Sequence, residues 1–597
     1  MCGIVGYIGD KQAQPILLHC LKKLEYRGYD SCGIAVIEDG IQVYKDAIRV
    51  EALGKILPRF NGTVGIGHTR WATHGEPSLV NAHPHLDCTG NIAVVHNGII
   101  SNFPALKHQL AIEGHQLISE TDTEVIPHLI EKHYKDNNGS LEEAVEATLN
   151  NVEGSYAIIV AMMGYPKLVV ARKDSPLIIG IGDREYFIAS DVPALLDYTD
   201  RVIYLEDGDT GVITKDKIKI KRSGTEINGK EHKILWSVEE AQKSGYEHFL
   251  LKEIHEQPRV IRNTIGEYTR TLDTTVNFEV TEDTGIEPIL MLAAGSSYNA
   301  ALIGKCIMEE LLNIPVQVEL SSEFNYHNHA LTRTTAIAIT QSGETADTLK
   351  AMKKLKGAGC RVIAITNVVG STASRIANQT IYTYAGPEIS VAATKSFIAQ
   401  LMVFYWLSLS SSKIDIGRLT NLLGDLRQIP SKVQQVLDNT IKITEQAKYL
   451  SRYENVFFIG RGINFPVALE GALKLKEISY IHAEGYAAGE TKHGPFALLG
   501  SNTPVIAVVS KDNTYEAMLT NIKEIKARKS PVIALTEEGD EIVEELADSV
   551  IWTPPVDTIF LPVVNTVSLQ LLAYYAAKER DCPIDFPRNL AKSVTVE

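Results

Sequence analysis

The chain has 597 residues, of which 45% are hydrophobic and 22% are charged. This composition excludes a largely disordered chain, and the length exceeds what one hydrophobic core supports, so several packed domains are expected. The formal net charge of −15 repels nucleic acid and anionic membranes, so neither is expected as a partner. A phosphate site would have to be local, built from backbone N–H groups, hydroxyls and a helix N-terminus.

The seven cysteines show no CxxC spacing, which predicts reduced thiols without a disulfide framework. Residues 1–10 lack the charged and apolar regions of a signal peptide. The longest apolar stretch, 397–409, is interrupted by Gln400 and is too short to cross a bilayer. We therefore expect a cytoplasmic protein.

The first part of the chain combines many short β-rich runs with few helical stretches. Turns rich in Gly, Asp and Asn separate these runs, which predicts a layered α+β domain over residues 2–236. A polar segment at 223–233 and a charged helix predicted at 237–254 lead into a linker with connecting helices, 237–277. The predicted strands are 4–8, 34–37, 64–67, 92–95, 156–162, 168–171 and 186–189, and the predicted helices are 14–24 and 124–134.

From about residue 278 the pattern changes to buried strands that alternate with long helices. This alternation is typical of a doubly wound parallel sheet. We predict one such domain at 278–430, a second at 445–585, and an extended tail at 586–597. The predicted strands are 289–293, 335–340, 362–366, 456–459, 505–509 and 532–535, and the predicted helices are 298–312, 345–356 and 372–377.

The two α/β domains share an order of features that indicates an internal duplication. In each, a strand ends in a glycine turn, a helix follows, and a later strand ends in a polar turn. Coincidence between two generic α/β layouts is the alternative.

Cys2 directly follows the initiator Met, and removal of that Met would leave a thiol and a free α-amine on one residue. The α-amine has a reference pKa of about 8, so it can serve as the base for its own thiol. A small second residue is also common in proteins without such chemistry, so this signal alone is weak.

Three further motifs in the first part supply partners for such a thiol. Arg70 follows a predicted strand and suits bidentate capture of a carboxylate. Asn97 and Gly98 follow another predicted strand, and an Asn side chain with a Gly N–H is a common oxyanion hole. The sequence from Thr121 to Glu124 predicts a capping box at a helix start, and Asp122 there could hold an ammonium group or only complement the helix dipole.

These residues lie in motifs that resemble the class II, N-terminal-nucleophile glutamine amidotransferases. The motifs are CGIVG at 2–6, YRGYDS at 26–31, HTRWATHG at 68–75, NAHPH at 81–85 and HNG at 96–98. The resemblance implies a four-layer αββα fold, Cys2 as nucleophile and Asn97 with Gly98 as oxyanion hole. It also implies Arg70 and Asp122 on the two ends of glutamine, with Thr73 and His74 nearby, and Trp71 as an ammonia gate.

The density of histidines in this part raises a metal site as the alternative. No acidic residue or cysteine lies at tight spacing with them, and their intervals fit no zinc template well. We therefore predict no metal here. The histidines are His68, His74, His83, His85 and His96.

In the second part, two hydroxyl-rich turns each end a buried strand and open a helix. They are GSS at 295–297 and TQSGET at 340–345. Each is consistent with helix capping alone, but two turns in one domain, at the carboxyl edge of a parallel sheet, favour a phosphate monoester. Neither matches a dinucleotide or P-loop motif.

A helix and two later segments carry charged residues that could act on a sugar. Glu470, Lys474 and Glu477 share one helix face, which is also the pattern of a salt-bridged surface helix. The glycine-rich run 487–494 holds His493, and the tail holds Lys592 after prolines that stop the last helix.

Together these motifs resemble the two sugar-isomerase (SIS) domains of the isomerising glutamine–fructose-6-phosphate aminotransferases, the glucosamine-6-phosphate synthase family. The resemblance runs through both parts of the chain and implies transfer of glutamine nitrogen to fructose 6-phosphate, the first step of hexosamine synthesis. It implies no cofactor and a homodimer that shares the sugar site. The residues implied at the sugar phosphate are Ser296, Ser297, Thr340, Gln341, Ser342, Thr345, Val391, Glu470, Lys474 and Ala591.

The resemblance also implies three catalytic roles in this part. His493, lent by a partner subunit, would open the sugar ring, Lys592 would form a Schiff base at C2, and Glu477 would move a proton between C1 and C2. Two alternatives are a glutamine phosphoribosyltransferase, whose diphosphate loop is absent, and a non-catalytic sugar-phosphate sensor, which would need only the phosphate loops.

Overall fold

The computed structural model describes residues 2–136, 139–234, 242–270, 289–327 and 335–595. The chain divides into two compact units. The first consists of Met1–Ala241 with Glu344–Ala346 and Ala591–Glu597, and the second consists of Gln242–Gly343 and Asp347–Leu590.

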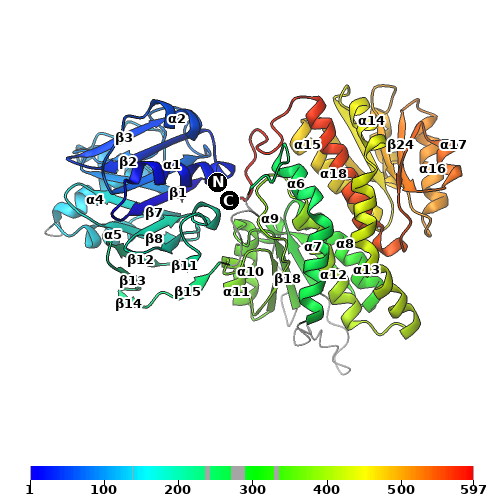
Figure 1. Ribbon diagram of the computed structural model, residues 1–597, viewed down its shortest axis with the longest axis horizontal. Coiled ribbons are helices and arrows are strands. Elements are labelled where there is room, and N and C mark those ends of the chain that lie inside the picture. Colours follow the sequence, from blue (N-terminus) through cyan, green and yellow to red (C-terminus); the bar gives the residue numbers. More distant parts are fainter. Residues whose placement is uncertain (1, 137–138, 235–241, 271–288, 328–334, 596–597) are drawn as a thin grey trace. The chain divides into compact units, whose positions relative to one another are not determined.

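The first unit is built on two antiparallel sheets (Figure 1). One sheet has the strand order β15-β11-β9-β10-β1-β4-β2-β3, and the other has the order β14-β13-β12-β8-β7-β6-β5. The strands are β1 (Gly3–Ile8), β2 (Ser31–Ile37), β3 (Ile41–Asp46), β4 (Val64–Arg70), β5 (His85–Leu86), β6 (Ile92–Ile100), β7 (Gly154–Met162), β8 (Leu168–Lys173), β9 (Ile178–Ile181), β10 (Tyr186–Ala189), β11 (Arg201–Tyr204), β12 (Asp209–Ile213), β13 (Ile218–Arg222), β14 (Thr225–Ile227) and β15 (Glu231–Lys233).

Apolar side chains from both sheets meet in one core, and helices cover the outer faces. Ile4, Ile66, Val95 and Ile159 belong to the core between the sheets. A second core, which includes Leu129, lies between the β5–β14 sheet and its helices. The helices of this unit are α1 (Ala13–Leu24), α2 (Val50–Ile56), α3 (Phe103–Ile112), α4 (Val125–Asp136) and α5 (Leu141–Leu149). The four-layer αββα fold that the resemblance implies is confirmed.

The second unit contains two five-stranded sheets in which every paired strand is parallel. Their orders are β17-β16-β18-β19-β20 and β22-β21-β23-β24-β25, so the prediction of doubly wound sheets is confirmed. The strands are β16 (Ile289–Ala293), β17 (Val316–Leu320), β18 (Thr335–Thr340), β19 (Arg361–Thr366), β20 (Gln379–Tyr382), β21 (Asn455–Gly460), β22 (His482–Ala487), β23 (Val505–Val508), β24 (Val532–Glu537) and β25 (Ser549–Thr553).

One large hydrophobic core serves both parallel sheets. It includes Met291 of the first sheet, Phe458 of the second and Phe404 and Leu569 of the helices around them. The helices are α6 (Phe249–His255), α7 (Gln257–Arg270), α8 (Ser296–Leu312), α9 (Ser321–Phe324), α10 (Ala346–Gly357), α11 (Thr372–Ile376), α12 (Lys395–Ser411), α13 (Ile416–Asp438), α14 (Ile441–Leu450), α15 (Asn464–Ser479), α16 (Tyr515–Lys526), α17 (Glu541–Leu546) and α18 (Leu561–Glu579).

The two ends of the second unit are tied together by a helix cap. The Asp585 carboxylate accepts hydrogen bonds from the backbone N–H groups of Phe249 and Leu250, both at 3.0 Å. These donors open α6, whose first N–H groups have no partner within the helix. Leu250 and Ile254 then pack into the shared core.

One predicted helix cap and one predicted helix start are wrong. The capping box from Thr121 to Glu124 does not form, because the Glu124 carboxylate accepts from the N–H groups of Ile118 and Ser119 instead, and α4 begins at Val125. In the helix predicted at 237–254, residues 235–241 lie outside the described chain, residues 242–248 form turns, and α6 begins only at Phe249.

Within the described residues, one helical segment is long and apolar enough to cross a membrane by length and composition. It is 558–579, which includes α18, and 94% of its apolar window is buried inside the protein. Its apolar character therefore fits the shared core that it helps to form.

Candidate active sites

Cys2 lies just before β1, next to the end of β4. Its Sγ accepts a hydrogen bond from the Trp71 N–H at 3.3 Å and lies 3.5 Å from the Trp71 carbonyl oxygen. Burial raises the pKa of the Cys2 thiol, while the Trp71 N–H and the positive charge of Arg70 act in the opposite direction. The thiol is therefore the favoured form at neutral pH and needs a base for attack.

Asn97 reaches Cys2 through a hydrogen-bond chain in which every donor and acceptor is determined. The Asn97 Nδ2 donates to the Cys2 carbonyl at 2.9 Å, so the Asn97 Oδ1 faces the other way, toward His68. The His68 Nε2 lies 3.1 Å from this Oδ1 and 3.0 Å from the His96 carbonyl oxygen. Both are acceptors, so the His68 Nε2 carries the proton and donates. His68 thereby holds the amide NH₂ of Asn97 toward the backbone carbonyl of Cys2.

Burial lowers the pKa of His68 to about 3. The imidazole therefore stays neutral across the physiological pH range, which matches the single proton that the hydrogen-bond chain requires. The proposed oxyanion hole thus has a fixed donor direction without an added charge.

Only glycine fits at position 98, because the neighbouring strand β7 lies very close to it. The motif at 96–98, expected to follow a strand, lies inside β6, where Asn97 pairs with Ala157 and Gly98 with Tyr156 of β7. Gly98 has φ +131°, and a Cβ there would come within 2.1 Å of the Ser155 carbonyl oxygen. No other residue fits this position without moving β7.

Arg70, at the end of β4, holds the loop that follows it. Its NH2 donates to the carbonyls of His74 and Gly75, the latter at 3.0 Å, and its NH1 lies 3.4 Å from the Glu76 carbonyl oxygen. A guanidinium has five N–H donors, so an Arg in this position can bind a carboxylate while it organises the loop. This structural role was not foreseen from the sequence.

Asp122 is buried on the other side of that loop. Its Oδ2 accepts from the Ile100 N–H at 2.8 Å, and its Oδ1 lies 3.9 Å from the His74 Nδ1. The Thr73 hydroxyl lies 3.4 Å from the same ring nitrogen. The first unit therefore connects the predicted glutamine-binding residues Thr73, His74 and Asp122 through one set of contacts.

Four of the five histidines considered for a metal site, His68, His83, His85 and His96, are buried. The rings of His68 and His83 stack with centroids 4.1 Å apart, and His85 contacts His83 edge-on at 4.7 Å. Burial lowers the pKa of His83 and His85 well below the usual value. The His96 Nδ1 lies 2.8 Å from the Thr123 hydroxyl. These contacts give the four buried histidines packing and hydrogen-bonding roles.

In the second unit, two of the three predicted charged residues of α15 are buried. Lys474 is 2% exposed and Glu470 is fully buried, with the Lys474 Nζ 3.6 Å from the Glu470 carboxylate and in an ion pair with Glu477, whose side chain is 21% exposed. Burial alone would lower the pKa of Lys474, but the charges of Glu477 and Glu470 outweigh it and raise that pKa. The interpretation as a surface helix is therefore wrong for Glu470 and Lys474.

Glu470 connects α15 to the first hydroxyl-rich turn. Its two carboxylate oxygens accept hydrogen bonds from the Ser296 hydroxyl and the Asn299 amide, each at 2.8 Å. Ser297, the next residue, accepts a hydrogen bond on its hydroxyl from the Gln400 amide at 3.0 Å. Sequence reasoning missed Asn299 and the role of Gln400, although a Gln inside the apolar run 397–409 was a usable signal.

The second hydroxyl-rich turn follows β18. The Thr340 hydroxyl accepts from the Gly343 N–H at 3.2 Å, and the Gln341 carbonyl accepts from the Asn367 N–H at 3.1 Å. Gly343 has φ +70°, and a Cβ there would meet the Ser371 hydroxyl at 2.2 Å. The turn is therefore a tight backbone loop that carries Ser342, with Thr345 directly before α10.

The remaining predicted sugar-site residues are spread over the chain. The Val391 N–H donates to the Asp585 carbonyl at 3.2 Å, and His493 ends an exposed 3₁₀ helix, Ala488–His493. Ala591 and Lys592 belong to the tail, which groups with the first unit. Their relation to Glu477 stays a prediction.

Comparison with known proteins identifies both parts of the chain. A family model described as "Glutamine amidotransferase domain" matches residues 69–197, and one described as "SIS domain" matches 286–410 and again 449–580. The double match confirms the predicted duplication. A glutamine–fructose-6-phosphate aminotransferase [isomerizing] of Caldanaerobacter subterraneus subsp. tengcongensis is 48% identical over 614 residues, with both chains covered completely. This chain belongs to that family.

Other relatives and a solved structure agree with this assignment. The aminotransferase of Methanosarcina acetivorans is also 48% identical over both whole chains, and that of Thermococcus kodakarensis is 47% identical over both. The C-terminal domain of glucosamine-fructose-6-phosphate aminotransferase from Francisella tularensis is 35% identical, with a TM-score of 0.54. It covers 58% of this chain and all of its own. The members of this family are enzymes. This agrees with the buried polar residues Asn97 in the first unit and Glu470 and Lys474 in the second.

Proposed function

We propose that this chain transfers the amide nitrogen of L-glutamine to D-fructose 6-phosphate and isomerises the product, giving D-glucosamine 6-phosphate and L-glutamate. One observation carries the proposal. A single chain, related over its whole length to this aminotransferase family, combines the Cys2–Asn97 pair with the ion-paired residues Glu470, Lys474 and Glu477.

In the first step, Cys2 attacks the side-chain amide carbon of glutamine. Its α-amine, free once Met1 is removed, takes the thiol proton and passes it to the departing ammonia. The Asn97 Nδ2 and the Gly98 N–H stabilise the negative oxygen that forms. Arg70 binds the substrate carboxylate and Asp122 binds its ammonium, with Thr73 and His74 beside them. Water then releases glutamate from the thioester.

In the second step, Lys592 condenses with the C2 carbonyl of the open sugar and releases water, and ammonia then displaces the lysine from the imine. Glu477 moves the proton from C1 to C2, which converts the ketose into the aldose. Lys474 forms an ion pair with Glu477, and Glu470 contacts both Lys474 and the Ser296 hydroxyl. His493, from a partner subunit, opens the ring.

The phosphate is held by hydroxyls and backbone N–H groups rather than by a cluster of cations. Ser296 opens α8, and the turn that carries Thr340, Gln341 and Ser342 leads through Thr345 to α10, so two helix N-termini face an anion. Ser297 completes the hydroxyl set, and Val391 and Ala591 line the sugar. Trp71 gates the ammonia, and the enzyme works as a cytoplasmic homodimer at the start of hexosamine synthesis without a cofactor.

The test uses the purified full-length protein with glutamine and fructose 6-phosphate. Glucosamine 6-phosphate and glutamate should form together, and omission of either substrate should abolish the amino sugar. In Cys2→Ala, glutamine-dependent product should vanish, while fructose 6-phosphate binding, measured by calorimetry, should stay within about twofold of wild type.

Cys582→Ala is the matched control, since this partly buried thiol lies in the second unit and should retain activity. Product formation by Cys2→Ala at the wild-type rate would contradict the nucleophile assignment. Loss of sugar binding in that variant would contradict two separate sites. A mature chain that retains Met1 and is fully active would exclude the α-amine as base.

A further inference from the structure

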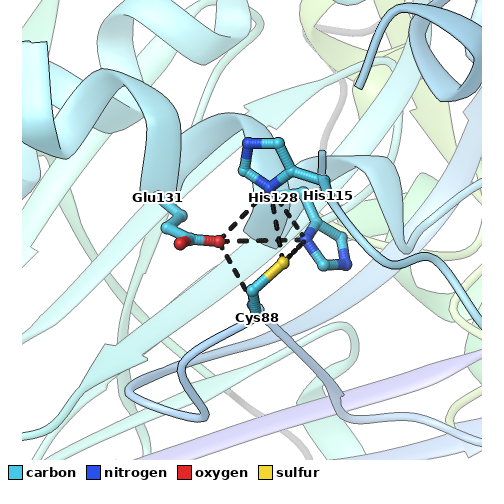
Figure 2. A group of neighbouring side chains, drawn as sticks. All are labelled: Cys88, His115, His128 and Glu131. Carbon is cyan, nitrogen blue, oxygen red and sulfur yellow. Dashed lines mark hydrogen bonds and ion pairs between the residues drawn. The ribbon is translucent and has the colours of Figure 1, made fainter. Parts of the chain in front are cut away.

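We propose that Cys88, His115, His128 and Glu131 of the first unit bind one zinc ion. Figure 2 shows their side chains converging from three segments. Cys88 lies in the turn between β5 and β6, His115 follows α3, and His128 and Glu131 are neighbours on α4. Their ligand atoms all lie within 4.8 Å of one another, and no other group of this kind occurs among the residues that the structure describes.

The distances between the ligand atoms match the edges of a tetrahedron. With Zn–S near 2.3 Å and Zn–N or Zn–O near 2.0–2.1 Å, tetrahedral angles require about 3.6 Å for each S···N edge and about 3.3 Å for each N···N or N···O edge. The Cys88 Sγ lies 3.5 Å from the His115 Nδ1 and 3.3 Å from the His128 Nδ1. The two Nδ1 atoms are 3.3 Å apart.

The Glu131 carboxylate supplies the fourth corner of the tetrahedron. The Glu131 Oε2 lies 3.3 Å from the His115 Nδ1 and 3.9 Å from the His128 Nδ1. Four of the five measured edges are therefore within about 0.3 Å of the values expected for bound zinc. A small movement of Glu131 toward His128 would shorten the fifth distance, from Oε2 to Nδ1, to the value expected for bound zinc.

Hydrogen bonding alone does not account for the short distances between these ligand atoms. Three atoms, the Cys88 Sγ and the two Nδ1 atoms, lie within 3.5 Å of one another in a closed triangle. Each ring N–H points along a single direction in its ring plane, so it can serve one partner, and the remaining lone pairs face each other. A central cation satisfies all of these lone pairs at once.

The chemistry of the donors favours zinc among divalent cations. One thiolate, two imidazoles and one carboxylate are the ligand types that Zn²⁺ binds in closed four-coordinate sites. The thiolate and the carboxylate together balance the charge of the ion. The second Glu131 oxygen accepts from the Lys135 Nζ at 2.8 Å, so the carboxylate is already oriented by its neighbour.

The position of the site indicates a structural role rather than a catalytic one. His128 is 2% exposed and Glu131 is 7% exposed, whereas Cys88 is at the surface, so an ion has a path of entry. Four protein ligands leave no open coordination position for a substrate. Zinc would fasten the β5–β6 turn and the end of α3 to α4. Asp122 and Thr123 directly precede α4, so this clamp would steady one side of the glutamine site.

The test is the metal content of the full-length protein, purified without chelators from zinc-supplemented medium. Elemental analysis should find about one zinc per chain, and Cys88→Ser and His128→Ala should each reduce it at least tenfold. Replacement by Co²⁺ should give the visible d–d bands of a tetrahedral site with a thiolate charge-transfer band, and Cys88→Ser should remove that band.

His108→Ala, an exposed residue of α3, and Cys582→Ser are the matched controls and should keep full zinc content. If a variant fails to fold, chelation of the wild-type protein gives the second readout, and a dipicolinate-treated sample should unfold at a lower temperature and recover when Zn²⁺ is added. Less than a tenth of an equivalent of zinc with no cobalt spectrum would overturn the proposal. Full zinc content in Cys88→Ser would overturn it equally.

Discussion

His68 acts on Cys2, the proposed nucleophile, through Asn97 rather than directly. Its Nε2–H bonds the Asn97 Oδ1 and so directs the Asn97 Nδ2 toward Cys2. Because burial lowers the pKa of His68 to about 3, this orientation does not change with pH in the physiological range. His68 is therefore a positioning residue for the proposed oxyanion hole.

Replacement of His68 by Leu frees the Asn97 amide to turn. We expect the kcat for glutamine hydrolysis to fall about 10- to 100-fold, somewhat less than the loss of a whole oxyanion-hole donor, with little change in KM. His68→Gln keeps an N–H donor and should restore part of the rate. Steady-state assays of glutamate release measure both parameters.

A double-mutant cycle separates this effect from general damage to the core. In an Asn97→Ala background the amide is already absent, so His68→Leu should cause little further loss of kcat. Independent losses in the double variant would show that His68 does not act through Asn97.

At the scale of the element, α15 brings a buried lysine between two carboxylates. Lys474 compensates Glu470 and Glu477 in a setting with little water. Removal of one partner from a buried ion pair leaves an uncompensated charge, which is far more costly than a lost surface pair.

We therefore expect Lys474→Met to lower the free energy of unfolding of the second unit by about 3–5 kcal/mol. Lys476→Met, two residues away on the exposed side of the helix, should change it by less than about 0.5 kcal/mol. Urea denaturation followed by circular dichroism measures both. Equal effects of the two substitutions would show that the ion pairs of Lys474 with Glu470 and Glu477 do not stabilise the folded unit more than a surface lysine does.

The elements themselves were predictable to different degrees. The bounds of β10, β16 and β18 follow from their sequences, because each is an unbroken apolar or β-branched run between turn residues. Edge strands such as β17 were missed, since half of their residues face solvent and are polar. The start of α4 was predicted to within one residue, but its capping box was wrong because Glu124 bonds the N–H groups of Ile118 and Ser119.

The candidate sites were predictable only where motif and chemistry coincide in a short stretch. Cys2, Arg70 and Asn97 stand in such motifs. The contacts of Ser296 and Asn299 with Glu470 span more than 170 positions, and no pattern in one sequence reveals them. The zinc ligands are likewise spread over residues 88–131, with only the helical spacing of His128 and Glu131 as a local signal.

At the scale of the whole molecule, the buried histidines make stability depend on pH. Burial lowers the pKa of His68, His83, His85 and His96 in the folded first unit, whereas each titrates near 6.5 when unfolded. The unfolded chain therefore binds more protons below that value. The stabilisation is complete above pH 6.5 and is lost as the pH falls from 6.5 toward 3.

Between pH 7.5 and 5.5, protonation of the unfolded chain at His68, His83 and His85 should lower the free energy of unfolding by about 1.4 kcal/mol for each ring. Denaturant titrations that follow the first unit should show a marked loss over this interval. His83→Gln, which removes one of these titrating rings, should reduce the pH dependence. A stability that stays flat from pH 7.5 to 5.5 would show that these rings are already protonated in the folded chain.

The helix cap that Asp585 places on α6 determines how short a folded fragment of the second unit can be. The matched SIS repeats begin at residue 286, yet Leu250 and Ile254, well before that point, fill the core between the repeats. A fragment trimmed to the repeats, 286–580, would lack both α6 and Asp585 and would expose this apolar surface. The smallest autonomous ammonia-dependent isomerase should therefore start upstream of Phe249 and extend past Asp585.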